Sequence, residues 1–170
     1  MNSNIYWIPT QFEGRIGIMP CLWGSKGLED EIRDWRHAGA DLVVSLLELA
    51  EARELGLEAE ESLCLQAGLD FISFPIPDRG IPGNRSEVVQ LVERLRSSVL
   101  SGNGVAIHCL GGIGRSAMVA ALVLLSLGAS ADNVFELISE ARGCEVPGTP
   151  EQAEYALTFY SAPGRDPFLK

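Results

Sequence analysis

The sequence predicts an α/β fold, in which a central mixed, mostly parallel sheet is flanked by helices. Short apolar runs of strand length alternate with longer amphipathic segments from residue 28 onward. Several of these runs, such as 42–47, are almost continuously apolar, as in strands that are buried on both faces. We therefore expect helices on both sides of the sheet and ligands beyond the carboxyl ends of its strands.

The N-terminal half is expected to contain four short strands and three helices. Residues 5–8 and 15–19 have the pattern of two short strands near one edge, separated by a turn that contains glycine. Residues 28–38 have apolar side chains at helical spacing, and Gly39 is a suitable stop. The next expected elements are a strand at 42–47, acidic helices at 48–55 and 58–67, and a strand at 71–74.

The C-terminal half carries clear helix-capping signals. Asn84 and Glu87 resemble a capping box for a helix that extends to about residue 101. A strand at 105–109 and an apolar helix at 115–127 follow. Ser130 is expected to cap a helix that reaches residue 141. Thr149, Pro150 and Gln152 then predict the start of a last helix, as N-cap, first-turn proline and capping-box glutamine.

Length and charge restrict the possible functions. The 170 residues fit one domain, with its core at about 40–160 and a tail at 162–170. Lys and Arg number 13 and Asp and Glu number 23, which gives a net charge of −10. Such a chain is a poor general binder of nucleic acid, which needs a basic surface. It is equally unsuited to docking on an anionic membrane.

We expect a protein of the reducing cytoplasm. Residues 1–9 lack the pattern of a signal peptide, and the longest apolar stretch, 117–129, is too short to cross a bilayer. The four cysteines, at 21, 64, 109 and 144, form no closely spaced pair, so a disulfide framework is not expected. Metal-ligand spacing does not occur, and we expect neither a metal nor a cofactor.

The residues best suited to catalysis lie where the strand at 105–109 is followed by the helix at 115–127. The connecting loop contains three glycines, whose backbone N–H groups can converge on an anion. The helix N-terminus adds partial positive charge, and Arg115 adds a planar fork suited to two phosphate oxygens. Nearby cations and helix N-termini favour the thiolate form of cysteine. We therefore expect Cys109 to be a thiolate under a bound phosphate.

This stretch resembles the active-site signature of the cysteine-dependent protein phosphatases, in which five residues separate a cysteine from an arginine. The pattern His-Cys-x-x-Gly-x-x-Arg-Ser matches at His108, Cys109, Gly112, Arg115 and Ser116. Residues 74–82, Phe-Pro-Ile-Pro-Asp-Arg-Gly-Ile-Pro, look like the general-acid loop of the small dual-specificity members. The proline-aspartate pair in this segment is similar to that of the kinase-associated phosphatase group. In outline, the resemblance covers roughly residues 40–160.

The resemblance implies a role for each of these positions. Cys109 would attack phosphorus, Arg115 would stabilise the transferred group, and Asp78 would act as general acid and then as base. His108 is expected to hydrogen-bond backbone groups and hold the loop, and Ser116 to support the thiolate. The residues expected to bind the substrate phosphate are Leu110, Gly111, Gly112, Ile113, Gly114 and Arg115.

Other residues have weaker claims to a role. Arg79 and Arg85 flank Asp78 and can attract an anionic substrate, although solvated loop charges explain them equally well. Gln152 can position the hydrolytic water, as a glutamine does in some relatives, but its capping role already accounts for it. Glu48 and Glu51 can orient Arg115, although a solvated helix face is the simpler interpretation. Cys21, Cys64 and Cys144 fit the core, and any of them can protect Cys109 as a disulfide.

The resemblance predicts hydrolysis of phosphate monoesters on phosphoproteins through a phosphocysteine intermediate. Phosphotyrosine is the expected substrate group, with phosphoserine and phosphothreonine as further candidates. The loop between Cys109 and Arg115 lacks the lysines common in relatives that act on polyphosphoinositides. In the low-molecular-weight phosphatases and arsenate reductases, the cysteine loop precedes the acid, whereas here it follows. A phosphate-binding module without turnover and a rhodanese-type sulfur transferase are the alternatives.

Overall fold

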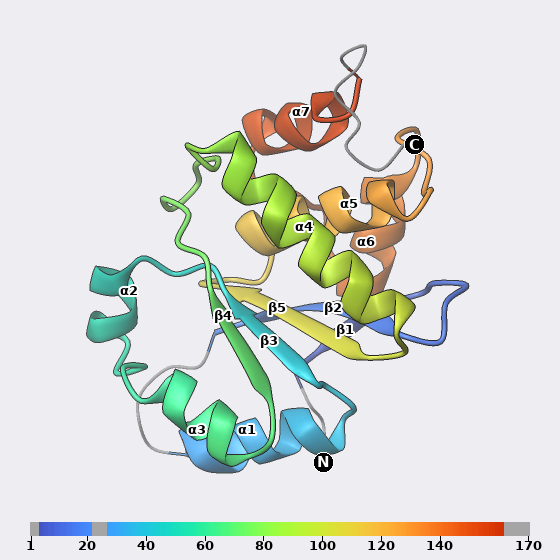
Figure 1. The fold of residues 1–170 in the computed structure, drawn as a ribbon. Coiled ribbons are helices and arrows are strands. Elements are labelled where there is room, and N and C mark those ends of the chain that lie inside the picture. Colours follow the sequence, from blue (N-terminus) through green and yellow to red (C-terminus); the bar gives the residue numbers. More distant parts are fainter. Residues whose placement is uncertain (1–3, 22–26, 162–170) are drawn as a thin grey trace.

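Five strands form one mixed sheet in the order β1-β2-β5-β3-β4 (Figure 1). The structure is a computed structural model that describes residues 4–21 and 27–161. β1 pairs with β2 in antiparallel orientation, and the other neighbours are parallel. The strands are β1 (Tyr6–Ile8), β2 (Arg15–Pro20), β3 (Leu42–Ser45), β4 (Asp70–Ser73) and β5 (Gly104–Cys109). The predicted α/β class with a mostly parallel sheet is thus confirmed.

Helices cover both faces of this sheet, as Figure 1 shows. One apolar core lies between the sheet and α4 to α7, and a second lies between the sheet and α1 with α3. The helices are α1 (Leu28–His37), α2 (Leu49–Glu54), α3 (Glu60–Gln66), α4 (Arg85–Leu100), α5 (Arg115–Ser126), α6 (Val134–Arg142) and α7 (Pro150–Thr158). The tail predicted at 162–170 lies outside the described residues.

The central strand β5 sets the geometry of the site. Its parallel register places Pro20 of β2 opposite Cys109 and Ser45 of β3 opposite His108. The carboxyl ends of three strands therefore meet at one edge of the sheet. Because side chains alternate along a strand, Cys109 joins the core under α4 to α7 while His108 faces α1 and α3.

Helix α5 runs through the larger core directly after the loop at residues 110–114, which we call the cysteine loop. Its first ten residues are all buried, which explains the apolar stretch seen in the sequence. In the part of the chain that the structure describes, no helix combines the length and apolarity needed to span a membrane.

The start predicted for the sixth helix is wrong by three residues. Ser130 does not cap α6, which begins at Val134 after the N-cap residue Asn133. Instead, the Ser130 hydroxyl accepts a hydrogen bond from the backbone N–H of Asp132. A serine hydroxyl that accepts from the amide two residues ahead stabilises a turn. The helix therefore begins only after this turn.

Burial in the larger core predicts a contrast between two leucines of α4. Leu95 is fully buried, whereas Leu100 is 48% exposed. Leu95→Ala is expected to lower the free energy of unfolding by about 2–5 kcal/mol, because it leaves a cavity. The matched control Leu100→Ala is expected to change it by roughly 0.5 kcal/mol. Urea denaturation measures both values, and equal losses would contradict the assignment of the core.

Candidate active site

The loop between β5 and α5 forms the floor of the candidate site. Cys109 ends the strand, and Arg115 begins the helix, so residues 110–114 make a tight connection. Gly112 has a φ of 62°, and a Cβ atom there would lie 2.4 Å from the carbonyl carbon of Met19. Only glycine fits this contact with the end of β2, so the loop is pressed against the neighbouring strand.

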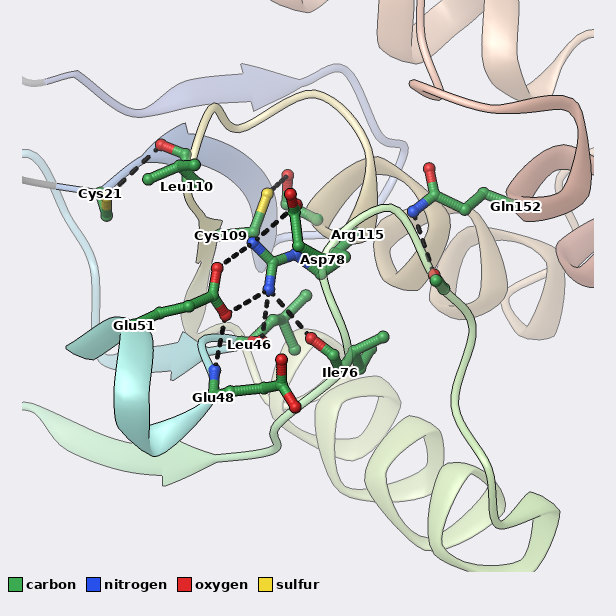
Figure 2. A network of polar contacts seen from close by, with 12 residues as sticks. Cys21, Leu46, Glu48, Glu51, Ile76, Asp78, Cys109, Leu110, Arg115 and Gln152 are labelled. Carbon is green, nitrogen blue, oxygen red and sulfur yellow. Dashed lines mark hydrogen bonds and ion pairs between the residues drawn. The ribbon is translucent and has the colours of Figure 1, made fainter. Parts of the chain in front are cut away.

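The Cys109 thiol is buried at the base of this loop. Its Sγ atom donates a hydrogen bond of 3.4 Å to Oγ of Ser116, in the first turn of α5. This contact places the Ser116 hydroxyl beside the sulfur. Once the sulfur is ionised, the same contact allows the hydroxyl to donate instead. Figure 2 shows the sulfur close to Arg115 and Asp78.

Arg115 is almost fully buried and makes a dense set of contacts (Figure 2). Its Nη1 and Nη2 atoms donate to the two carboxylate oxygens of Glu51, at 2.7 and 2.9 Å. Nη1 also donates to the carbonyl of Ile76 at 2.9 Å and, more weakly, to that of Leu46 at 3.4 Å. Two strand ends and helix α2 thus hold the guanidinium beside the loop.

The charges around Arg115 reinforce one another. Burial alone would lower the pKa of Arg115, but its hydrogen bond to Glu51 and the negative charges of Cys109, Glu51 and Asp78 raise it above the usual value. Burial would raise the pKa of Glu51, but its bonds to Arg115 and to the backbone N–H of Glu48 lower it. Both side chains are therefore charged at neutral pH.

Asp78 lies at the mouth of the site, in the loop that follows β4. Its Oδ1 atom is 3.2 Å from Nη2 of Arg115, and its side chain is 57% exposed. The pocket between the two loops has a volume of about 220 Å³. Its lining residues are Asp78, Arg79, Leu110, Gly111, Ile113, Gly114, Arg115, Gly148, Thr149 and Gln152. The fold therefore brings together the acid, the arginine and the loop that the sequence identified.

Gln152 belongs to the wall of this pocket rather than to a complete capping box. Its backbone N–H donates to Oγ1 of Thr149, so the predicted N-cap is confirmed. Its side chain, however, reaches across the pocket, and Nε2 donates to the carbonyl of Gly80 at 3.0 Å. The buried Oε1 atom has no hydrogen-bond partner among the described residues. The predicted capping-box role of this side chain is thus wrong.

His108 lies behind the strand and does not hydrogen-bond backbone groups as predicted. Its Nε2 atom is 2.9 Å from Oε1 of the buried Glu60, without the alignment of a hydrogen bond. Its Nδ1 atom has no partner within the described part of the chain. The prediction failed because β5 directs this side chain toward α1 and α3, where it meets the Glu60 carboxylate and the Trp35 ring.

Glu51 is the residue that the sequence interpretation undervalued. It was expected on a solvated helix face, but it is the bidentate partner of Arg115. The signal was its place just after the strand at 42–47, at the edge where the site forms. Glu48 is the N-cap residue of α2. Arg85 lies away from the pocket, because it donates to the carbonyl of Phe159 and stacks on that ring.

All four cysteines are free, but they occupy different surroundings. Cys64 is a core residue, as expected, whereas Cys144 is exposed and the core prediction for it is wrong. Cys21 is buried beside the site, where its N–H donates to the carbonyl of Cys109. Burial and the nearby charge of Cys109 raise the pKa of Cys21 to about 11. Within residues 4–21 and 27–161, no group of three or more His, Cys, Asp or Glu side chains is arranged to hold a metal ion.

Comparison with known families identifies the same region. The family described as "Polymorphic toxin system, DSP-PTPase phosphatase" matches residues 17–129, which include Asp78 and the cysteine loop. Cyclin-dependent kinase inhibitor 3 of Homo sapiens is 32% identical over 154 residues, covering 88% of this chain and 72% of that protein. Its counterpart in Rattus norvegicus is 26% identical over 165 residues, covering 91% of this chain and 77% of that protein.

Solved structures agree on the fold. Kinase associated phosphatase, with its catalytic site cysteine substituted by serine, superposes with a TM-score of 0.84 at 20% identity. That alignment covers 95% of this chain and 96% of the other. The active form of Tk-PTP has a TM-score of 0.68 at 27% identity, covering 91% of this chain and 94% of the other.

The Glu51–Arg115 pair predicts a pH-dependent loss of stability. Because the pKa of Glu51 is lowered in the folded protein, the pair stabilises above the ordinary carboxyl pKa of about 4.3 and is lost as the pH falls through the lowered value. Glu51→Gln is expected to cost about 1.5–3 kcal/mol at pH 7 and much less near pH 3.

Thermal unfolding across this pH range tests the pair. Glu54→Gln removes an exposed carboxylate from the same helix and is the matched control, expected to have little effect at any pH. A Glu51→Gln deficit that stays constant from pH 7 to pH 3 would count against the ion pair as its cause.

Proposed function

The chain belongs to the dual-specificity family of cysteine-dependent protein phosphatases, and on this premise we propose that it hydrolyses phosphate monoesters on phosphoproteins through a phosphocysteine intermediate. One observation carries the proposal. Asp78, Arg115 and the loop after Cys109 line a single pocket, with the Cys109 sulfur beneath it. A nucleophile, an acid and an anion-binding loop are the three components that this reaction needs.

In the first step, the Cys109 sulfur attacks phosphorus, and the bond to the leaving oxygen breaks. The loop amides of residues 110–114 and the Arg115 guanidinium stabilise the equatorial oxygens. Asp78 donates its proton to the leaving oxygen, because an alkoxide or phenoxide departs poorly without one. The position of Asp78 at the exposed mouth of the pocket supports this role, since the leaving group must point away from the sulfur.

In the second step, water hydrolyses the phosphocysteine. Asp78, now ionised, takes a proton from the water as the oxygen attacks phosphorus. The sulfur–phosphorus bond breaks, inorganic phosphate leaves, and Ser116 donates a hydrogen bond to the departing thiolate. The Ser116 hydroxyl, 3.4 Å from Sγ, supports that assignment. The free Oε1 atom of Gln152 in the same pocket is compatible with an additional contact to this water.

The proposed substrate group is phosphotyrosine, with phosphoserine and phosphothreonine as further candidates. The loop between Cys109 and Arg115 has no cationic side chain, and polyphosphorylated headgroups need several. The proposal takes residues 1–170 as one phosphatase domain in the reducing cytoplasm. Four free thiols, one of them the proposed nucleophile, support a reducing compartment.

Substitution of the nucleophile tests the reaction itself. Cys109→Ser is expected to abolish hydrolysis of an aryl phosphate, because a hydroxyl at this position is not ionised at neutral pH. Cys144→Ser changes an exposed thiol in the same way and is expected to keep wild-type activity. Pre-steady-state measurements are expected to show a burst of aryl alcohol. Equal, slow hydrolysis by wild type and Cys109→Ser would refute the proposal, and saturable binding of a phosphopeptide without a burst would instead indicate a binding module.

The leaving-group dependence of Asp78→Asn tests the general acid. With a poor leaving group, the variant is expected to lose about 10²–10⁴-fold in kcat, the range of a positioned proton donor. With a very good leaving group, the loss is expected to be small. Asp132→Asn, on an exposed turn, provides the charge-matched control. Equal losses with both leaving groups would show that Asp78 does not donate the proton.

A further inference from the structure

Arg142, the last residue of α6, donates two hydrogen bonds to the cysteine loop. Its Nε atom donates to the carbonyl of Gly112 at 3.0 Å, and one Nη atom donates to the carbonyl of Gly111 at 3.1 Å. The two contacts reach successive carbonyls of the segment expected to bind phosphate. Arg142 does not line the pocket, whereas Gly111 and Ile113 do. The guanidinium therefore contacts the loop from outside the pocket.

The geometry of the peptide bond transmits this contact to the pocket side. The loop peptides are trans, so the N–H of each peptide unit points opposite to its C=O. The carbonyl of Gly111 shares its peptide unit with the N–H of Gly112, and the carbonyl of Gly112 shares its unit with the N–H of Ile113. When Arg142 holds both carbonyls, it fixes both N–H groups so that they point away from its guanidinium.

One further contact holds Arg142 in this position, and another holds the loop. Its guanidinium lies 4.2 Å from the centre of the Tyr6 ring on β1, beside which α6 packs. The aromatic face stabilises the cation and restricts its rotation. On the other flank, Gly112 contacts the backbone at Met19 so closely that a Cβ atom would not fit. The loop is thus fixed between a charged fork and the end of β2, and it cannot turn its amides without breaking one of these contacts.

We infer that Arg142 is a positioning residue of the phosphate site, which orients the N–H groups of Gly112 and Ile113 toward the bound oxyanion. This inference rests on the proposed function of the loop. A cation that donates to a carbonyl also polarises the peptide unit, which strengthens the N–H on its other end as a donor. Arg142 therefore acts through the loop and makes no contact with substrate.

Binding of tungstate, a tetrahedral oxyanion that needs no turnover, measures this role directly. Arg142→Met is expected to weaken tungstate binding by about 10- to 100-fold, the range of a lost charge-assisted contact. Arg142→Lys keeps the charge but cannot hold two carbonyls in a fork, and a loss of about tenfold is expected. Arg94→Met removes the same charge from an exposed site on α4 and is expected to bind as wild type does. Calorimetry gives the Kd values, and thermal unfolding identifies any variant that does not fold.

Backbone NMR separates positioning from a general structural role. In the wild type, the amide resonances of Gly112 and Ile113 are expected to shift on addition of tungstate, and in Arg142→Lys these shifts are expected to shrink. If Arg142→Met does not fold, Arg142→Lys decides the matter. Tungstate affinities within twofold of Arg94→Met, with unchanged shifts, would overturn the inference alone. Tungstate that does not bind the wild type would overturn both the inference and the proposed function.

Discussion

A buried guanidinium dominates the architecture of this site. Desolvation of a cation costs several kcal/mol, so a buried arginine persists only where its donors are met by charges and carbonyls. Arg115 meets that condition with Glu51, which occupies both arms of its fork, and with the carbonyl of Ile76 beyond β4. The contacts that offset this desolvation thus connect α2 and the loop that carries Asp78 to the start of α5. With the guanidinium held in this way, Nη2 of Arg115 also faces Asp78, and both residues line the pocket.

The strand β5 separates two environments with different chemistry. On one face, Cys109 points toward the helix N-terminus and Arg115, where negative charge is stabilised. On the other face, His108 contacts the buried Glu60 and the Trp35 ring. Cys21 belongs to the core on the His108 face, where burial and neighbouring negative charges raise the pKa of its thiol to about 11. The Cys109 sulfur, by contrast, contacts the Ser116 hydroxyl in the first turn of α5.

Contacts from outside the signature motif determine how the cysteine loop is shaped. Met19 limits Gly112 on one side, and Arg142 holds the loop carbonyls on the other. Across the pocket, Gln152 holds the carbonyl of Gly80, two residues after Asp78, and so links α7 to the acid loop. Each of these residues comes from a different element. The loop and the acid therefore depend on the packing of α6 and α7 as much as on their own sequences.

The sequence by itself determined the alternation of strands and helices, the cysteine loop with Arg115, and the position of Asp78 in a loop at a strand end. These features are local, because hydrophobic spacing, capping residues and glycines act over a few positions. Strand alternation, which is also local, puts His108 on the face opposite Cys109. Only the tertiary structure decided which distant side chains meet. Glu51 at Arg115, Glu60 at His108, Gln152 at Gly80 and Arg142 at the loop are contacts between separate elements. No local pattern encodes such pairs, because they depend on how the helices pack against the sheet.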